Sequence, residues 1–379
     1  MTPVTKAPAM TAVYDKTLSE RQLCDLELIL NGGFAPLEGY LTRDDYASVL
    51  ETARLADGRL WPMPVSLILT AAERAAMGAA GRVALRDAAG RLVAELEVES
   101  VEPFDAAAYA HAVFGADDAN HPYRRALQGR EDGWRLGGRV VARDGVRRSD
   151  FAHLRRDPAE VKAMIRRAGW RKVVAFQTRN PLHRSHFHLT LDALDQLGPE
   201  AGLLLNPAVG PTQPGDIDPA VRVACYERIL HRYPHGRAAL ALLPLSMRMA
   251  GPREAVWHAI IRKNHGATHF IVGRDHAGPS AKRADGATFF HPYAAQEMLA
   301  RHAAEIGITP VFSQDVAYYP AIDQYLPVDR APAGLESRAL SGSRQRELLA
   351  AGEPLPEWFS FPEVASLLRD AARPPALAA

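Results

Sequence analysis

Three side chains able to hold an anion follow a short apolar run near the middle of the sequence. Arg179 lies in the polar segment Gln177–Pro181, and His183 and His186 follow it three residues apart. Residues at this spacing on a helix share one face, so both imidazoles are expected to point toward the same ligand. Because a guanidinium binds anions through several N–H groups, this combination predicts an anion-binding site.

The elements that must position these side chains are a strand and a helix. Val173–Phe176 is an apolar β-type run, and a helix is expected from Leu182 to near Gly198. The free N–H groups and the positive end of the helix dipole then face the turn between them. Strand–turn–helix units are common, and one histidine on a helix is usually a surface or core residue. The hypothesis therefore depends on the combination of residues in this turn.

A second polar turn, Gly273–Gly278, follows the apolar residues Ile271 and Val272. It is not a G-x-G-x-x-G fingerprint, and no Walker A sequence occurs in the chain. Its glycines permit close approach of the backbone to a ligand, and Arg274 can bind phosphate. The alternative is an ordinary strand-to-loop turn in which Arg274 and Asp275 form an ion pair.

Other arginines have two open interpretations. Arg248 and Arg253 flank the start of an expected helix, where they could contact a ligand or lie on the surface. Near the C-terminal end, Arg338, Arg344 and Arg346 could face a phosphate or a partner subunit. A solvated helix face explains the last three equally simply.

The composition excludes several classes of protein. The 379 residues are 47% hydrophobic and 23% charged with a net charge of +1, so no strong field favours nucleic acid or an anionic membrane. Cys24 and Cys225 are too few for a disulfide framework or a cysteine-rich zinc site, and are expected to be buried in a reducing compartment. Met1–Lys16 lacks the apolar core of a signal peptide, and no 18-residue apolar window occurs. We therefore expect a cytoplasmic protein.

The length and the pattern of elements predict three regions. Residues 1–150 contain short β-type runs, including a hairpin around Ala88–Gly90. Residues 151–325 alternate between strands expected at 173–176, 202–205, 238–243, 268–272 and 309–316 and helices expected at 158–168, 182–198, 218–233, 252–264 and 293–306. Such alternation predicts an α/β domain with a parallel sheet, helices on both faces, and ligands beyond the carboxyl ends of the strands.

Residues 326–379 are expected to form a small subdomain. Ser341 is a candidate N-cap for a short helix, and Pro362 starts a second one. The stretch after Arg373 is rich in proline and alanine and is expected to be disordered.

Two of these segments resemble signatures of the ATP sulfurylase (sulfate adenylyltransferase) family. Gln177–His186 resembles the family pattern Q-x-R-N-P-x-H-x-x-H, and Gly273–Gly278 matches its G-R-D-H-A-G segment letter for letter. The resemblance covers nearly the whole length, through the further segments Gly33–Leu41, Trp61–Leu67, Met249–Glu254, Ser341–Leu349 and Trp358–Val364. With two cysteines and no P-loop, the chain is similar to the members without zinc and without a fused adenylylsulfate kinase domain.

The resemblance implies a fold and an activity. It implies a β-rich PUA-like domain at 1–150, a Rossmann-like nucleotidyltransferase domain at 151–325 and a small α/β subdomain at 326–379. Sulfate would attack the α-phosphorus of ATP in line, giving adenosine 5′-phosphosulfate and pyrophosphate in a reversible reaction. Mg²⁺ would accompany ATP, no zinc is expected, and the chain would form a homo-oligomer, a dimer or larger, without nucleic acid or membrane partners.

The resemblance also implies roles for individual residues, carried over by motif position. The catalytic group comprises Thr178, Arg179, Asn180, His183 and His186. Sulfate would contact Gln177, Arg179 and the backbone of Ala277. ATP would contact Gln177, Thr178, Arg179, Asn180, Gly273, Arg274, Asp275, His276 and Val316.

These residue types agree with the implied chemistry. Sulfate is fully ionised and needs no general base, so the difficulty is to bring a dianion up to a polyanion. Arg179 can hold sulfate through two parallel hydrogen bonds, which a lysine cannot do as well. The histidines, the backbone N–H groups and Mg²⁺ can neutralise the charge that moves onto the departing pyrophosphate.

Two other functions remain open at this stage. The chain could be an adenylyltransferase of the same superfamily that uses another acceptor. It could instead bind RNA through the PUA-like domain, although the balanced charge argues against this.

We predict that Arg179→Ala and His183→Ala each lose most of the activity while the protein remains folded. By analogy with the removal of one oxyanion-hole donor, each loss should raise the barrier by roughly 3 to 4 kcal/mol. Pyrophosphate release measures the effect. Turnover close to that of the wild type in either variant would contradict the assignment.

Overall fold

The computed structural model describes residues 12–313, 315–340 and 342–372. The chain forms two compact units. One contains the chain up to Asp150 together with Ala281–Phe289, and the other contains Phe151–Ser280 and the chain from Phe290 onward. The expected helix cap Ser341, the tail after Arg373 and most of Met1–Lys16 lie outside the described residues. Within the described residues, no helix has the length and apolar character needed to cross a membrane.

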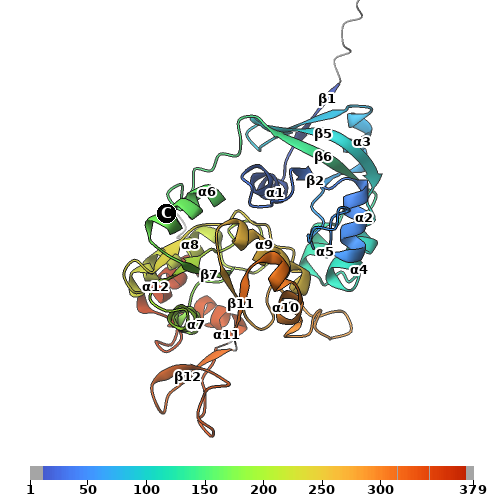
Figure 1. Cartoon of the computed structure of the whole chain (residues 1–379). Coiled ribbons are helices and arrows are strands. Elements are labelled where there is room, and N and C mark those ends of the chain that lie inside the picture. Colours follow the sequence, from blue (N-terminus) through green and yellow to red (C-terminus); the bar gives the residue numbers. More distant parts are fainter. Residues whose placement is uncertain (1–11, 314, 341, 373–379) are drawn as a thin grey trace, which may run out of the picture. The chain divides into compact units, whose positions relative to one another are not determined.

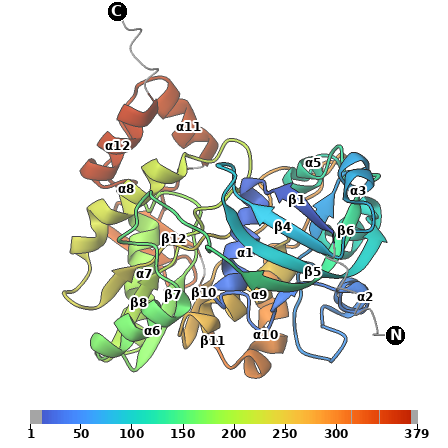
Figure 2. The ribbon, with the colours of Figure 1, turned by 90° about the horizontal axis from the view of Figure 1, so that it is seen from above.

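The first unit is built on a mostly antiparallel sheet of six strands. Its strands follow the order β1-β4-β5-β6-β2, with β3 also paired to β6, and β1, β4, β5 and β6 are labelled in Figure 2. Their bounds are β1 Val13–Thr17, β2 Gly39–Tyr40, β3 Leu67–Leu69, β4 Arg82–Arg86, β5 Leu92–Pro103 and β6 Trp134–Ala142. The helices are α1 Glu20–Leu30, α2 Arg43–Thr52, α3 Ala71–Met77, α4 Ala106–Phe114 and α5 Pro122–Ala126. The antiparallel pair β4–β5 confirms the predicted hairpin.

A loop from late in the sequence completes this first unit. Ala281–Phe289 belongs to it, although more than a hundred residues separate the loop from the rest of the unit. The N–H of Ala284 donates to Asp118 at 2.7 Å, and the ring of Phe289 meets the edge of His121 at 4.9 Å between centroids. Nothing in the sequence pattern indicated this insertion.

The second unit contains the predicted parallel sheet. Its strand order is β11-β10-β7-β8-β9, with every pairing parallel. The bounds are β7 Lys172–Phe176, β8 Ala201–Leu205, β9 Ala238–Leu240, β10 His269–Val272 and β11 Thr309–Phe312. The helices between them are α6 Pro158–Arg167, α7 Arg184–Gln196, α8 Pro219–Ile229, α9 Gly251–Asn264 and α10 Ala294–Ile306. A short 3₁₀ turn, Leu230–Arg232, extends α8.

Burial on both faces explains why the central strand is continuously apolar. Val174 and Phe176 of β7 belong to a core with residues of α7 and α8, such as Leu194 and Val223. Val173 on the opposite face is buried as well, and α9 packs against α10 and β10 (Figure 1). A strand covered by helices on both sides needs apolar residues at successive positions, as in other parallel sheets.

Three predicted boundaries are wrong. The helix expected from Leu182 begins at Arg184 with His183 as its N-cap, so His183 precedes the first helical turn. The strand expected at 238–243 stops at Leu240. The strand expected at 309–316 is two strands, because β11 ends at Phe312 and a separate strand begins at Val316. Terminal boundaries depend on caps and pairing partners, which apolar pattern alone does not specify.

The remaining elements form a hairpin and a helix pair. The strands β12 Val316–Tyr319 and β13 Gln324–Pro327 pair antiparallel with each other. The helices α11 Gly342–Ala350 and α12 Pro362–Ala372 lie side by side (Figure 2), and α12 also packs on α8. These segments therefore join the same compact unit as the parallel sheet.

We predict that Gly202→Ala destabilises the second unit by about 1 to 3 kcal/mol. A methyl group on Gly202 would overlap the Trp170 ring, which is held by a 2.9 Å hydrogen bond from its Nε1 to the carbonyl of Gly236. Urea denaturation measures the loss. In a Trp170→Leu background the same substitution should cost less, and an equal cost in both backgrounds would contradict the packing argument.

Candidate active site

A pocket of about 530 Å³ lies beyond the carboxyl ends of β7 and β10. All twelve residues implied by the family resemblance line it, namely Gln177, Thr178, Arg179, Asn180, His183, His186, Gly273, Arg274, Asp275, His276, Ala277 and Val316. The two turns meet because β7 and β10 are hydrogen-bonded neighbours in the sheet. The structure thus brings together two segments that are more than ninety residues apart.

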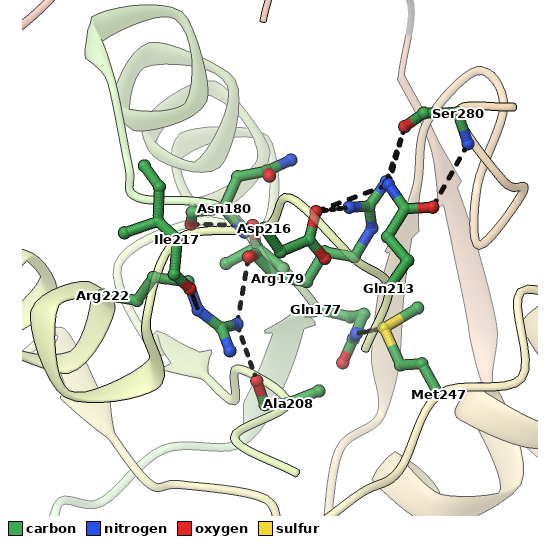
Figure 3. A network of polar contacts seen from close by, with 11 residues as sticks. Gln177, Arg179, Asn180, Ala208, Gln213, Asp216, Ile217, Arg222, Met247 and Ser280 are labelled. Atoms are coloured by element: carbon green, nitrogen blue, oxygen red, sulfur yellow. Dashed lines mark hydrogen bonds and ion pairs between the residues drawn. The ribbon is translucent and has the colours of Figure 1, made fainter. Parts of the chain in front are cut away.

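The turn after β7 is held in shape by its own side chains and by α8. The hydroxyl of Thr178 accepts from the N–H of Asn180 at 3.0 Å, and the hydroxyl of Tyr226 donates to the carbonyl of Asn180 at 2.7 Å. The buried Arg222 donates through Nη1 to the carbonyls of Arg179 and Ala208, each at 3.0 Å (Figure 3). The backbone of the turn is therefore fixed before any ligand binds.

The guanidinium of Arg179 is held at the pocket by polar neighbours. Its Nη1 lies 2.5 Å from the Oδ1 of Asp216, and its Nη2 lies 3.4 Å from the Oγ of Ser280 (Figure 3). The side-chain amide of Gln213 lies between Asp216 and Ser280. Only 16% of the Arg179 side chain is exposed, so its orientation is restricted and its charge remains in contact with the pocket.

The two histidines stack on one another at the start of α7. Their ring centroids are 3.8 Å apart, and His183 also stacks on Phe359 at 4.8 Å. Neither Nδ1 has a hydrogen-bond partner among the described residues. His183 provides no side-chain cap for α7, and the N–H of Arg184 donates to the carbonyl of Phe359 at 3.0 Å. The remaining first-turn N–H groups and the two imidazoles are together at the pocket wall, where an anion could bind.

Burial favours the neutral form of these two imidazoles. It lowers the pKa of His186 to about 4. The pKa of His183 is also well below its usual value, mainly because of burial and further because of its neighbour His186. A neutral imidazole can still donate one hydrogen bond to an oxyanion, and a bound anion would favour the protonated form.

The turn after β10 adopts a backbone that few side chains favour. Asp275 and Ala277 have φ angles of 53° and 56°, in the left-handed region. Such backbone outliers cluster at ligand sites, where the surrounding structure holds them in place. Arg274 pairs with Asp275 and with Asp315, each at 3.2 Å. The ion pair considered in the sequence analysis is therefore present, and Arg274 remains partly exposed at the pocket.

Later segments of the chain contribute apolar side chains to the pocket lining. They include Val316, Val328, Leu340 and Trp358. The lining thus offers apolar surface for a flat group in addition to hydrogen-bond donors and positive charge.

The remaining candidate residues lie elsewhere. Arg338, Arg344 and Arg346 are exposed. The interpretation of Arg248 as a surface residue is wrong, because it is 2% exposed and its guanidinium lies 5.0 Å from the Trp257 ring centroid. The supporting residues Asp216, Arg222 and Arg262 contact Arg179 or Gln177. The sequence did not identify them, since nothing near them in sequence indicates these contacts.

No metal site is evident among the described residues. Across 12–313, 315–340 and 342–372, no group of three or more His, Cys, Asp or Glu side chains is placed to hold a metal ion. Cys24 and Cys225 are both free thiols and are buried, as expected.

Taken together, the parallel sheet and the polar turns at its carboxyl edge define a nucleotidyltransferase-like α/β unit. Residues 152–371 match the family model for ATP-sulfurylase, and residues 5–144 match the model for a PUA-like domain. The chain belongs to the ATP-sulfurylase family.

Several relatives share most of this sequence. The chain is 50% identical over 368 residues to the sulfate adenylyltransferase of Gibberella zeae, covering 96% of this chain and 62% of that protein. It is 49% identical over 366 residues to that of Schizosaccharomyces pombe, covering 96% of this chain and 74% of that protein. The chain thus spans 62% of the length of the Gibberella relative and 74% of the Schizosaccharomyces relative.

A solved structure shares the fold. It is described as a hexameric APS kinase from Thiobacillus denitrificans, with a TM-score of 0.76 and 29% sequence identity. The match covers 95% of this chain and 63% of that one.

We predict that stability falls on acidification below about pH 6.5, the usual histidine pKa. His183 and His186 have depressed pKa values in the folded protein, so the unfolded chain binds more protons at acidic pH and stability is lost as the pH decreases. In His186→Asn the slope of unfolding free energy against pH should be shallower, by no more than about 1.4 kcal/mol per pH unit.

Urea denaturation between pH 7 and pH 5 measures this slope. The exposed His235, changed to Asn, is the control for removing an imidazole. An unchanged slope in His186→Asn would show that this ring does not titrate with unfolding.

Proposed function

We propose that the chain is a sulfate adenylyltransferase that joins sulfate to the adenylyl group of ATP and releases pyrophosphate, and that also runs in reverse. The observation that carries the proposal is that both signature turns line a single pocket and bring cationic and donor groups to it. The sulfate adenylyltransferases of Gibberella zeae and Schizosaccharomyces pombe, which are about half identical to this chain, support it.

In this proposal, the polar residues of the pocket lining bind both anions. Arg179 and the amide of Gln177 hold sulfate, with the backbone at Ala277. The stacked His183 and His186, with the N–H groups at the start of α7, receive the triphosphate. Since each of these groups is a donor or a cation, together they offset the repulsion between sulfate and ATP and stabilise charge on the departing pyrophosphate. Thr178 and Asn180 shape the turn.

The remaining contacts place the nucleotide. The turn Gly273–His276 lies where the nucleotide phosphates and ribose would pass, and the adenine would lie against the apolar lining at Val316. Mg²⁺ would enter with ATP, held mainly by phosphate oxygens and water, as is usual for this ion. This mode of binding requires no cluster of protein ligands.

The setting of the enzyme follows from the same proposal. We expect it to act in the cytoplasm and to use small-molecule substrates without nucleic acid. We also expect it to self-associate, since the related Thiobacillus structure is described as hexameric.

We predict that the purified chain releases pyrophosphate from MgATP only when sulfate is present. Molybdate should also support release, because it mimics sulfate but gives an unstable product. With adenosine 5′-phosphosulfate and pyrophosphate, the chain should form ATP. Pyrophosphate and ATP assays measure the two directions, and Arg179→Ala is the matched control for contaminating enzymes.

The two alternatives give different results. Release that depends on another acceptor but not on sulfate or molybdate would indicate a related adenylyltransferase. Retention of RNA on a filter at moderate salt, without pyrophosphate release, would indicate an RNA-binding protein.

A further inference from the structure

Helix α9 carries three ionisable residues along one buried stripe behind the pocket. Glu254, His258 and Arg262 are spaced four residues apart, and the relative exposure of each is 0%. Residues four apart lie above one another on one face of a helix. Burying such groups is unfavourable unless each has a specific partner, so the partners indicate what the stripe does.

Glu254 lies at the N-terminal end of the stripe and acts as an acceptor. One carboxylate oxygen accepts the N–H of Arg248 at 3.0 Å, and the other accepts the N–H of Ala250 at 2.8 Å. Burial raises the pKa of Glu254, and these two backbone bonds act in the opposite direction. His258 Nε2 lies 3.3 Å from Glu254 Oε1 without a well-aligned hydrogen bond, and burial lowers the pKa of His258 well below its usual value, so its ring is neutral. A carboxylate oxygen at this distance favours the tautomer of His258 that carries its hydrogen on Nε2.

His258 in turn contacts a residue of the pocket. Its Nδ1 is 3.1 Å from the Nε2 of His276, which lies in the turn after β10 and lines the cavity. With its hydrogen on Nε2, His258 offers a lone pair at Nδ1, so His276 must donate from Nε2. The Nδ1 of His276 is then bare in the neutral ring and becomes a donor when an anion promotes protonation.

Arg262 makes the corresponding contact with the other signature turn. Its Nη2 donates to the side-chain oxygen of Gln177 and, at 2.9 Å, to the carbonyl of Asn206. The amide nitrogen of Gln177 lies 3.4 Å from the sulfur of Met247, which is a weak acceptor. Because the oxygen is engaged from behind, the NH₂ group is the end of Gln177 available to a ligand in the pocket.

We propose that Glu254, His258 and Arg262 are positioning residues that turn hydrogen-bond donors toward an anion in the pocket. They do so by fixing the amide orientation of Gln177 and the tautomer of His276. The inference rests on the proposed function for the identity of the anions. The stripe touches no substrate and acts through the two pocket residues.

Groups on three elements surround His276. On α9, Glu254 raises its pKa while His258 and Arg262 lower it, and burial lowers it most. The Phe270 ring of β10 packs edge-on at 5.5 Å. In its own turn, Arg274 and Asp275 pair with each other. These surroundings favour a neutral His276, and we expect it to gain a proton when an anion binds.

We predict that Arg262→Met raises the KM for sulfate about tenfold and changes the KM for ATP by less than about twofold. One hydrogen bond that orients a charge-binding group accounts for a change of this size. Arg262→Lys, which keeps the charge and one donor, should recover part of the loss. His265→Asn is the control for changing a buried polar residue near α9. His265 directly follows α9, is buried, and does not line the pocket.

The tautomer is read directly by ¹⁵N NMR of histidine-labelled protein, with His276→Gln used to assign the signals. Without substrate, His276 should carry its hydrogen on Nε2, and inorganic pyrophosphate should add a proton at Nδ1. In His258→Asn, the preference of His276 for a hydrogen on Nε2 should be lost. The acid limb of the profile of kcat/KM against pH should also shift. His265→Asn should change neither.

The outcomes separate the two proposals. If the wild type shows no sulfate-dependent pyrophosphate release, the proposed function fails while the tautomer remains measurable. If activity is present but both KM values change equally in Arg262→Met, the inference is wrong. A hydrogen on Nδ1 of His276 in the substrate-free wild type also overturns it, and this result does not depend on whether a variant folds.

Discussion

The pairing of β7 with β10 is the constraint on which the pocket depends. Parallel strands end at the same edge of a sheet, so the turns that follow them open on the same side. Here the turn at Gln177–Pro181 and the turn at Gly273–Gly278 become neighbours through this one pairing. Without it, the two signature segments would be separate polar loops, and the pocket that they line together would not form.

Three residues that line the pocket, Arg179, Gln177 and His276, are each supported by polar groups behind them. Arg222 binds the carbonyl of Arg179, Asp216 pairs with its guanidinium, and the α9 stripe contacts Gln177 and His276. Such support is costly because charged groups must leave water. Its benefit is that the pocket dipoles are already oriented when the ligand arrives, which lowers the reorganisation that the reaction needs.

The same arrangement explains why the pocket contains uncommon backbone and unpaired ring nitrogens. Asp275 and Ala277 have positive φ angles, and the Nδ1 atoms of His183 and His186 have no partner among the described residues. A fold selected only for stability would satisfy these groups internally. Such backbone and such unpaired groups are common at ligand sites, where the surrounding core holds the local strain.

Interactions between residues that are neighbours in the chain made much of this fold and of the candidate pocket predictable from the sequence. The apolar run Val173–Phe176, the helix start at Pro158 and the polar residues of both signature turns are properties of neighbouring residues, and they indicated the parallel sheet and the candidate pocket. The roles of Arg222, Glu254, His258 and Arg262, the insertion of Ala281–Phe289 into the first unit, and the placement of His183 as an N-cap were decided only in three dimensions. Their partners are distant in the chain, and pairing across such distances is set by packing and desolvation, which leave no periodic trace in the sequence.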